Sequence, residues 1–141
     1  MTSPRVYRWA IGNPFTRWLA RRRAAQLFSV MAGFVHSQVL LACVRLHVLE
    51  ALREKPLSLS QLAHLGRMPE PAMQRLLHSA LALGLVEVRG VDRYGLGPLG
   101  APVAADPGLR QMIEHNAVLY DDMRDPLALL RDEVQPHMQA Y

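Results

Sequence analysis

LSLSQLAHLGRMPEPAMQRLLHSALALGLVEVRGVDRYGLGPL, residues 57–99, carries the local signals from which the fold can be read. It opens with Ser58 followed three residues later by Gln61, the spacing of a capping box at the start of a helix. The spacing predicts a short helix that runs through Leu65 and ends at Gly66, because glycine is the usual residue just past a helix end.

A second helix and two strands follow within the same stretch. Pro69 begins the helix and Gly84 ends it. Two short strands, 85–88 and 93–96, then flank a turn in which Gly90 supplies the permissive backbone. Helix, turn, helix and two-stranded wing is the order of a winged helix-turn-helix. The buried face of the second helix is predicted from its apolar periodicity: Ala72, Met73, Leu76, Leu77, Ala80 and Leu81.

Upstream of this motif, Gln26–Arg53 has the strongest helical pattern in the chain. Its residues are mostly Val, Leu, Phe, Met and Ala, and a helix that is apolar around most of its circumference needs a second layer to cover it. In so short a chain we expect that layer to be another subunit, although the central helix of a monomer is the alternative. The remaining residues fall on one narrow stripe: Ser29, Ala32, Gly33, His36, Cys43, His47, Glu50 and Glu54.

The middle of this helix also resembles a membrane span, because Leu27–Val44 carries no formal charge and follows three arginines. Polar residues at its centre (His36–Gln38) and the lack of a small-residue cleavage site argue against a span or a signal peptide. We therefore interpret it as a buried helix of a soluble assembly.

Downstream of the wing, Asp106 is placed to cap another helix with Pro107 at its first position. Pro126 should break this helix, after which a short piece, 127–131, resumes. The chain thus divides into a basic arm (1–25), a helix with the winged motif (26–104), and a helical segment (105–141).

Composition bounds the class of protein. The 141 residues are half hydrophobic, enough for a real core, and carry a net charge of +4. Residues 1–23 contain six arginines and no acid, whereas seven acids lie from Asp106 onward. The single cysteine, Cys43, excludes an internal disulfide and a multi-cysteine metal site, and its apolar surroundings predict an inert buried thiol. We expect a cytoplasmic protein.

Two function classes fit poorly. A DNA-binding regulator needs a basic recognition helix, but the exposed face of the second helix offers one arginine, Arg75, and begins with an acid, Glu70. A self-contained enzyme is also disfavoured. No histidine or acid cluster has metal-ligand spacing, and the run Gly95–Gly100 contains Pro98 and leads into no Rossmann helix. The small winged-helix transcriptional regulator remains the alternative function.

The sequence resembles a known family at four places: FVHSQVLLA (34–42), DRYGLGPLG (92–100), MIEHNAVLY (112–120) and DPLALLR (125–131). These segments look like the N-terminal dimerisation domain of S-adenosylmethionine-dependent O-methyltransferases, and the last two are similar to the bacterial demethylspheroidene branch, which methylates hydroxycarotenoids. The resemblance runs from about Phe15 to Arg131. It implies a homodimer whose N-terminal helices intertwine, with the helix after the wing forming part of the acceptor pocket.

The resemblance also implies what this stretch of chain lacks. In the family, S-adenosylmethionine and the catalytic base belong to a following Rossmann-like domain, which would come after Tyr141. We therefore expect no catalytic, cofactor-binding or metal-binding residue in these 141 residues, and no activity from them alone.

The resemblance and the helical spacing together give two sets of candidate residues. The candidates for the wall of the acceptor pocket are Met112, His115, Asn116, Tyr120, Met123 and His36. Such a wall, apolar with a few polar groups, would suit a hydroxylated polyene. For His36, a hydrogen bond across the dimer or a core position satisfied by a carbonyl are the alternatives. The candidates for the dimer interface are Phe28, Met31, Phe34, Val35, Val39 and Leu41.

The basic arm has an interpretation of its own. Trp9, Phe15 and Trp18 alternate with arginines, a composition that suits a membrane surface. Packing on the acidic segment of the partner subunit is the alternative. Nucleic acid is not expected as a partner.

Overall fold

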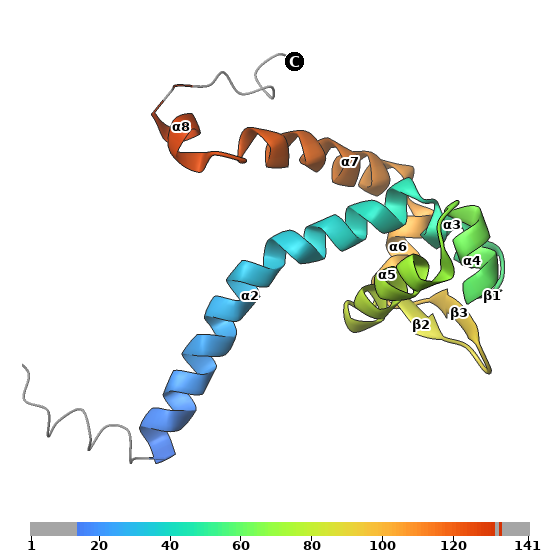
Figure 1. Cartoon of the computed structure of the whole chain (residues 1–141), viewed down its shortest axis with the longest axis horizontal. Helices are drawn as coiled ribbons and strands as arrows, with labels where there is room; N and C mark the ends of the chain where they lie inside the picture. Colours follow the sequence, from blue (N-terminus) through green and yellow to red (C-terminus); the bar gives the residue numbers. More distant parts are fainter. Residues whose placement is uncertain (1–13, 132, 134–141) are drawn as a thin grey trace, which may run out of the picture. The chain divides into compact units, whose positions relative to one another are not determined.

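The computed structural model describes residues 14–131 and 133 of the chain (Figure 1). The chain consists of two structural units, Met1–His36 and Ser37–Tyr141. The described residues are mainly helical, with one small antiparallel sheet. In chain order the elements are α2 (Pro14–Arg45), α3 (Val48–Glu54), β1 (Leu57–Ser58), α4 (Leu59–Leu65), α5 (Glu70–Ala82), β2 (Val86–Val88), β3 (Arg93–Leu96), α6 (Gly100–Ala105), α7 (Pro107–Asp122) and α8 (Pro126–Leu130).

Helix α2 is longer at its start and shorter at its end than the pattern predicted. It begins at Pro14, so residues 14–25 of the expected basic arm are helical; the arm's residues 1–13 lie outside the described part of the chain. It ends at Arg45, because His47 adopts a left-handed conformation with φ of 56°. The single helix expected over Gln26–Arg53 is therefore wrong. The turn redirects the chain so that α3 buries three core positions: Val48, Leu49 and Leu52.

The core of the second unit lies where α3, α4, α5, α6 and the sheet meet. Helix α3 packs against α6 and β3, and α4 packs against α5. On α5 five of the six predicted face residues are confirmed: Met73, Leu77 and Ala80 are buried, and Leu76 and Leu81 pack against the core, whereas Ala72 is only partly buried. The remaining buried members come from the end of α2, from α4, from α6, and from β2 with the residue before it: Cys43, Val44, Leu62, Ala63, Leu85, Val86, Val103 and Ala104.

The capping box predicted for α4 is present. The backbone N–H of Gln61 donates to the Ser58 hydroxyl at 3.2 Å, and the backbone N–H of Ser58 donates to the Gln61 side chain at 3.0 Å. These two bonds satisfy donors that the first turn of a helix otherwise leaves unpaired.

The sheet has three strands, in the order β1-β3-β2, instead of the two that the sequence predicted. Strand β1 pairs antiparallel with β3 through Leu57 opposite Tyr94. A strand of two residues has no readable alternation, so the sequence pattern does not reveal β1 beside the capping box. The guanidinium of Arg93 adds to this pairing by donating to the carbonyl of Pro56 at 3.2 Å.

The glycine run after β3 brings two backbone segments into contact. The N–H of Gly97 donates to the carbonyl of Leu85, and the N–H of Leu99 donates to the carbonyl of Gly84, each at 3.0 Å. A side chain at Gly97 or Gly100 would collide with the carbonyl oxygen of Gly84 or Leu85, respectively. Glycine is therefore required by close backbone approach. Helix α6 begins immediately afterwards; the sequence did not predict it.

Helix α7 begins as predicted. The Asp106 side chain accepts from the N–H of Gly108 at 2.7 Å, and Pro107 takes the first helical position. The helix ends before Pro126, where Asp125 is non-helical (φ −122°, ψ 89°) and caps the short α8. The proline therefore separates two helices, as the restriction on the residue before proline predicts.

Candidate functional site

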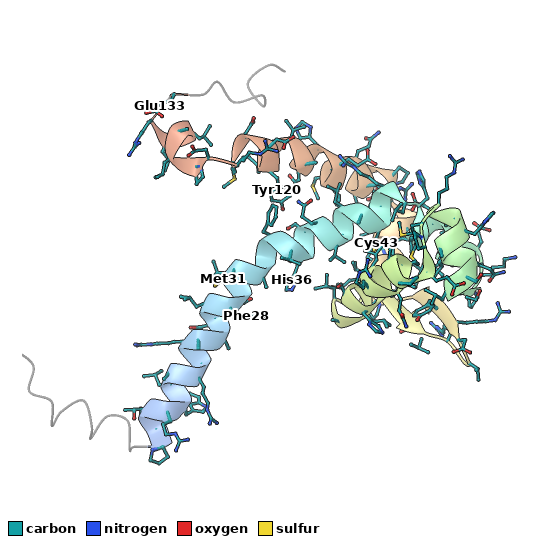
Figure 2. All side chains as sticks on the ribbon, in the orientation of Figure 1. Phe28, Met31, His36, Cys43, Tyr120 and Glu133 are labelled. Carbon is teal, nitrogen blue, oxygen red and sulfur yellow. The ribbon has the colours of Figure 1, made fainter. Side chains whose placement is uncertain are left out.

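The first candidate surface is an apolar segment of α2 whose side chains are exposed. Its six members are between 57% and 81% exposed, although each is a large hydrophobic residue: Leu27, Phe28, Val30, Met31, Phe34 and Val35. Figure 2 labels two of them, Phe28 and Met31. We call these six residues the α2 apolar segment. Contiguous exposed apolar side chains of this size mark a surface that another molecule covers.

Four of the six residues predicted for a dimer interface belong to the α2 apolar segment: Phe28, Met31, Phe34 and Val35. The other two lie elsewhere. Leu41 is 6% exposed, so it belongs to the interior of its own chain instead of a partner-facing surface. Val39 is half-buried and packs against the core of the second unit. Helical periodicity could not separate these positions, because α2 is apolar on both its covered and its uncovered faces.

Helix α2 also meets the length and composition of a membrane span. Within the described part of the chain, one helix meets these criteria, and it is α2. Its apolar window of 18 residues has a mean hydropathy of 1.8, and 17% of that window is buried. Core helices of soluble proteins meet the same criteria.

The second candidate surface is a small hollow in the second unit, between the end of α2 and the middle of α7. It has a volume of about 80 Å³ and five lining residues: Ser37, Leu40, Ile113, Asn116 and Tyr120. On α7 the lining positions are spaced by three and four residues, so they share one helix face. The hollow thus combines two aliphatic side chains with a hydroxyl, an amide and a phenol.

Two of the predicted pocket residues, Asn116 and Tyr120, line this hollow (Figure 2 labels Tyr120). Three others on or just after α7 do not line it and are exposed: Met112, His115 and Met123. His36 is also exposed and belongs to the first unit. Sequence reasoning missed Ser37, Leu40 and Ile113, because helical spacing shows which residues share a face but not which two helices meet.

Cys43 is poorly suited to act as a nucleophile. Its side chain is fully buried, and burial raises the pKa of the thiol from its ordinary value of 9.0 to about 12. Desolvation disfavours the thiolate, which is the reactive form. Across residues 14–131 and 133, no group of three or more His, Cys, Asp or Glu side chains is placed to hold a metal ion.

The surface that a winged-helix protein would use to bind DNA carries few unpaired basic side chains. Glu70, Arg75 and His78 are exposed on α5, so an acid begins the helix and a single arginine follows. In the β2–β3 hairpin, Arg89 pairs with Glu87, which neutralises its charge. Phosphate contacts supply most of the affinity for DNA, and this face offers few of them.

Comparison with known protein families distinguishes a dimerisation domain from a DNA-binding regulator. The O-methyltransferase dimerisation domain family matches residues 28–105, more than half of the chain. The chain belongs to this family. The match spans the α2 apolar segment from Phe28 onward, the α4–α5 pair, the sheet and α6. The alternative of a DNA-binding regulator is not supported.

Curated relatives of this dimerisation domain are longer proteins. The chain is 41% identical over 128 residues to a demethylspheroidene O-methyltransferase of Cereibacter sphaeroides, covering 91% of this chain and 34% of that protein. It is 38% identical to the protein of the same name from Rhodobacter capsulatus, covering 91% and 32%. The chain therefore spans about a third of the length of the curated relatives that it matches.

Solved structures show the same fold. The S-adenosylmethionine-dependent methyltransferase SibL is 32% identical with a TM-score of 0.57, and the match covers 65% of this chain and 28% of that one. LaPhzM is 19% identical with a TM-score of 0.71, covering 84% and 36%. The arrangement of helices and small sheet is thus shared with the SibL methyltransferase structure, and LaPhzM, at 19% identity, supports the fold alone.

Proposed function

We propose that residues 14–131 form the dimerisation and acceptor-pocket part of an S-adenosylmethionine-dependent O-methyltransferase that methylates a hydroxyl group of a hydroxycarotenoid. The family match and the demethylspheroidene names of the curated relatives support this proposal. The observation that carries it is the α2 apolar segment, because a dimerisation domain needs such a surface and the described residues leave it exposed.

The fold of the second unit supports a structural use of a winged helix-turn-helix. The order α4, α5, β2, β3 is that of the motif, with β1 added as a third strand. Because its exposed helix face is nearly neutral, we infer that the motif serves as a rigid platform and not as a reader of DNA. It holds α3 and α6, and through them α7, in fixed positions.

The methyl donor is, in this proposal, held by a part of the enzyme other than these residues. The glycine run at 95–100 does not fit a phosphate-binding loop, because Gly97 and Gly100 face the backbone carbonyls of Gly84 and Leu85. The described residues therefore contribute to acceptor binding and assembly, and no step of methyl transfer is assigned to them.

The hollow between α2 and α7 supports the acceptor assignment. A polyene alcohol needs aliphatic walls and a few groups that hydrogen-bond its hydroxyl. Leu40 and Ile113 supply the first kind, and Asn116 with the Tyr120 phenol supplies the second. At about 80 Å³ the hollow suits one end of such a molecule.

Sedimentation equilibrium of the 141-residue chain tests the dimer. We expect a dimer for the wild type and a monomer for Phe28→Glu/Phe34→Glu, because two carboxylates in an apolar interface are costly to desolvate. Val88→Glu/Val91→Glu is the matched control, since these exposed valines lie in the β2–β3 hairpin. A wild-type chain that stays monomeric at high micromolar concentration contradicts the dimerisation role.

Methyl transfer by the product of the complete open reading frame tests the acceptor pocket. Asn116→Ala and Tyr120→Phe should raise KM for a hydroxycarotenoid about 10-fold, the cost of roughly one hydrogen bond, and leave the Kd for S-adenosylmethionine unchanged. His78→Ala, on the exposed face of α5, is the control. Unchanged acceptor kinetics in both pocket variants would remove the hollow from the acceptor site.

A further inference from the structure

The first turns of α2 carry a concentration of arginines that the dimerisation role does not use. Arg17, Arg21, Arg22 and Arg23 are all exposed, and the first acidic residue of the chain is Glu50. The family match begins at residue 28, so this segment lies outside it. Four cations with no acid on the same element create a strong positive potential.

Aromatic side chains lie among these arginines. Phe15 is 66% exposed and Trp18 is 52% exposed, and their ring centroids are 6.0 Å apart. The Arg22 guanidinium lies 5.4 Å from the centroid of the Trp18 ring, a cation–π distance. Pro14, Arg17, Trp18 and Arg21 line an open hollow of about 320 Å³ on the same segment.

We propose that residues 14–23 of α2 form a docking surface for an anionic membrane surface. Indole rings favour the headgroup level of a bilayer, because one end of the ring is apolar and the other donates a hydrogen bond. Arginines at the same level attract anionic headgroups. This combination favours a lipid surface over an acidic protein segment, because an acidic segment would use the arginines but gain little from the exposed apolar surface of Phe15 and Trp18.

The surface binds the membrane peripherally. The arginines lie on several sides of the helix. The segment can therefore attract anionic headgroups, but it has no wide apolar face that could insert among the acyl chains. A surface of this kind would hold a dimeric enzyme close to bilayer-dissolved, apolar acceptors. It does not depend on the acceptor proposed above, because the attraction is electrostatic.

Vesicle co-sedimentation of the 141-residue chain provides the test. We expect binding to vesicles of phosphatidylglycerol and phosphatidylcholine, and at least 10-fold weaker binding to vesicles of phosphatidylcholine alone. Arg21→Gln/Arg22→Gln/Arg23→Gln should weaken binding to the anionic vesicles by roughly 100-fold, since each arginine near an anionic surface strengthens binding by about fivefold. Arg21→Lys/Arg22→Lys/Arg23→Lys should restore it, because charge and not guanidinium geometry carries the attraction.

A matched control removes the same charge elsewhere. Arg53→Gln/Arg75→Gln/Arg131→Gln changes three exposed arginines of the second unit and should lower binding by less than about fivefold. In a Trp9→Phe background Trp18 is the only tryptophan, so its emission should shift to the blue on anionic vesicles. Circular dichroism of each variant shows that it is folded.

Three results would overturn the proposal. Equal loss of binding in the control triple variant would make net charge, and not this segment, responsible. Binding to neutral vesicles that persists in 1 M salt, where the Debye length is about 3 Å, would indicate that α2 spans the bilayer. Absence of vesicle binding, with dimer dissociation caused by the Arg→Gln triple variant, would assign the arginines to an acidic segment of the second copy.

Discussion

Arg110 on α7 pairs with Glu50 on α3, with Nε of the guanidinium 3.1 Å from Oε1 of the carboxylate. The same guanidinium donates to the carbonyl oxygens of Val103 at 3.0 Å and Ala104 at 2.8 Å, which belong to the last turn of α6. One side chain therefore joins three helices. It satisfies carbonyls that a helix end leaves without an intrahelical partner, and it positions the start of the helix that carries Asn116 and Tyr120.

Replacing Arg110 should destabilise the second unit. We expect Arg110→Ala to lower the free energy of unfolding by about 2–3 kcal/mol, because the side chain is largely buried and three acceptors lose their donor. Glu50→Gln should cost about 1 kcal/mol, since the two carbonyl bonds of Arg110 remain. Urea unfolding measures both. Arg131→Ala, an exposed control, should stay within about 0.5 kcal/mol, and an equally mild effect of Arg110→Ala would contradict the bridging role.

The glycines after β3 should tolerate no side chain. Gly97→Ala and Gly100→Ala each place a Cβ against a backbone carbonyl that hydrogen bonds hold in place, so we expect losses of more than about 3 kcal/mol or failure to fold. Gly33→Ala is the control, because its Cβ would meet no atom within 4 Å and alanine favours a helix by about 1 kcal/mol. Soluble yield and thermal unfolding compare the three variants. A stable Gly100→Ala variant would show that the two segments can separate.

Burial of Cys43 predicts a pH dependence above pH 9. Below pH 9 the thiol is protonated in both the folded and the unfolded state, so its contribution to stability is complete. Between pH 9 and 12 only the unfolded state loses the proton, and stability should fall by about 1.4 kcal/mol per pH unit from this group. Cys43→Ala should show a shallower decline by that amount. Parallel pH profiles of the two proteins would mean that Cys43 is not desolvated.

Removing the N-cap of α7 should lower global stability, whereas removing the N-cap of α8 should have only a local effect. Asp106→Ala removes a bond to the N–H of Gly108 and should cost about 1 kcal/mol of global stability, because α7 packs against α6. Asp125→Ala removes bonds to the N–H groups of Leu127 and Ala128, and no residue of α8 is fully buried. We expect faster amide exchange in 127–130 with little change in global stability. A global loss equal to that of Asp106→Ala would show that α8 supports the core.

Much of the fold is readable from local signals in the chain. The capping box at Ser58, the proline and glycine that bound α5, and the Asp-Pro start of α7 all produced the elements that they predict. The short helix expected over 127–131 is α8, which begins one residue earlier, at Pro126. These signals act between residues a few positions apart, so no tertiary contact is needed for them to work. The apolar composition of α2 likewise indicates that the helix requires a partner.

The sequence-based predictions that were wrong concern features that depend on contacts between residues distant in sequence. The break at His47 has no glycine or proline to mark it, and it occurs because α3 must turn toward α6 and β3 to bury its apolar face. Strand β1 forms only because β3 lies beside it. The candidate site divides in the same way. Asn116 and Tyr120 follow from the periodicity of α7, but Ser37 and Leu40 join them only because the end of α2 packs there.

Residue types and spacings of a few positions are enough to specify most of the helices, their caps, the apolar character of α2 and the arginines at its start. Tertiary packing, in contrast, places Leu41 in the interior, brings Gly97 and Gly100 against a carbonyl, and lets Arg110 join three helices. The reason is physical: contact between elements depends on how whole helices and strands pack, and periodicity within one element does not contain that information.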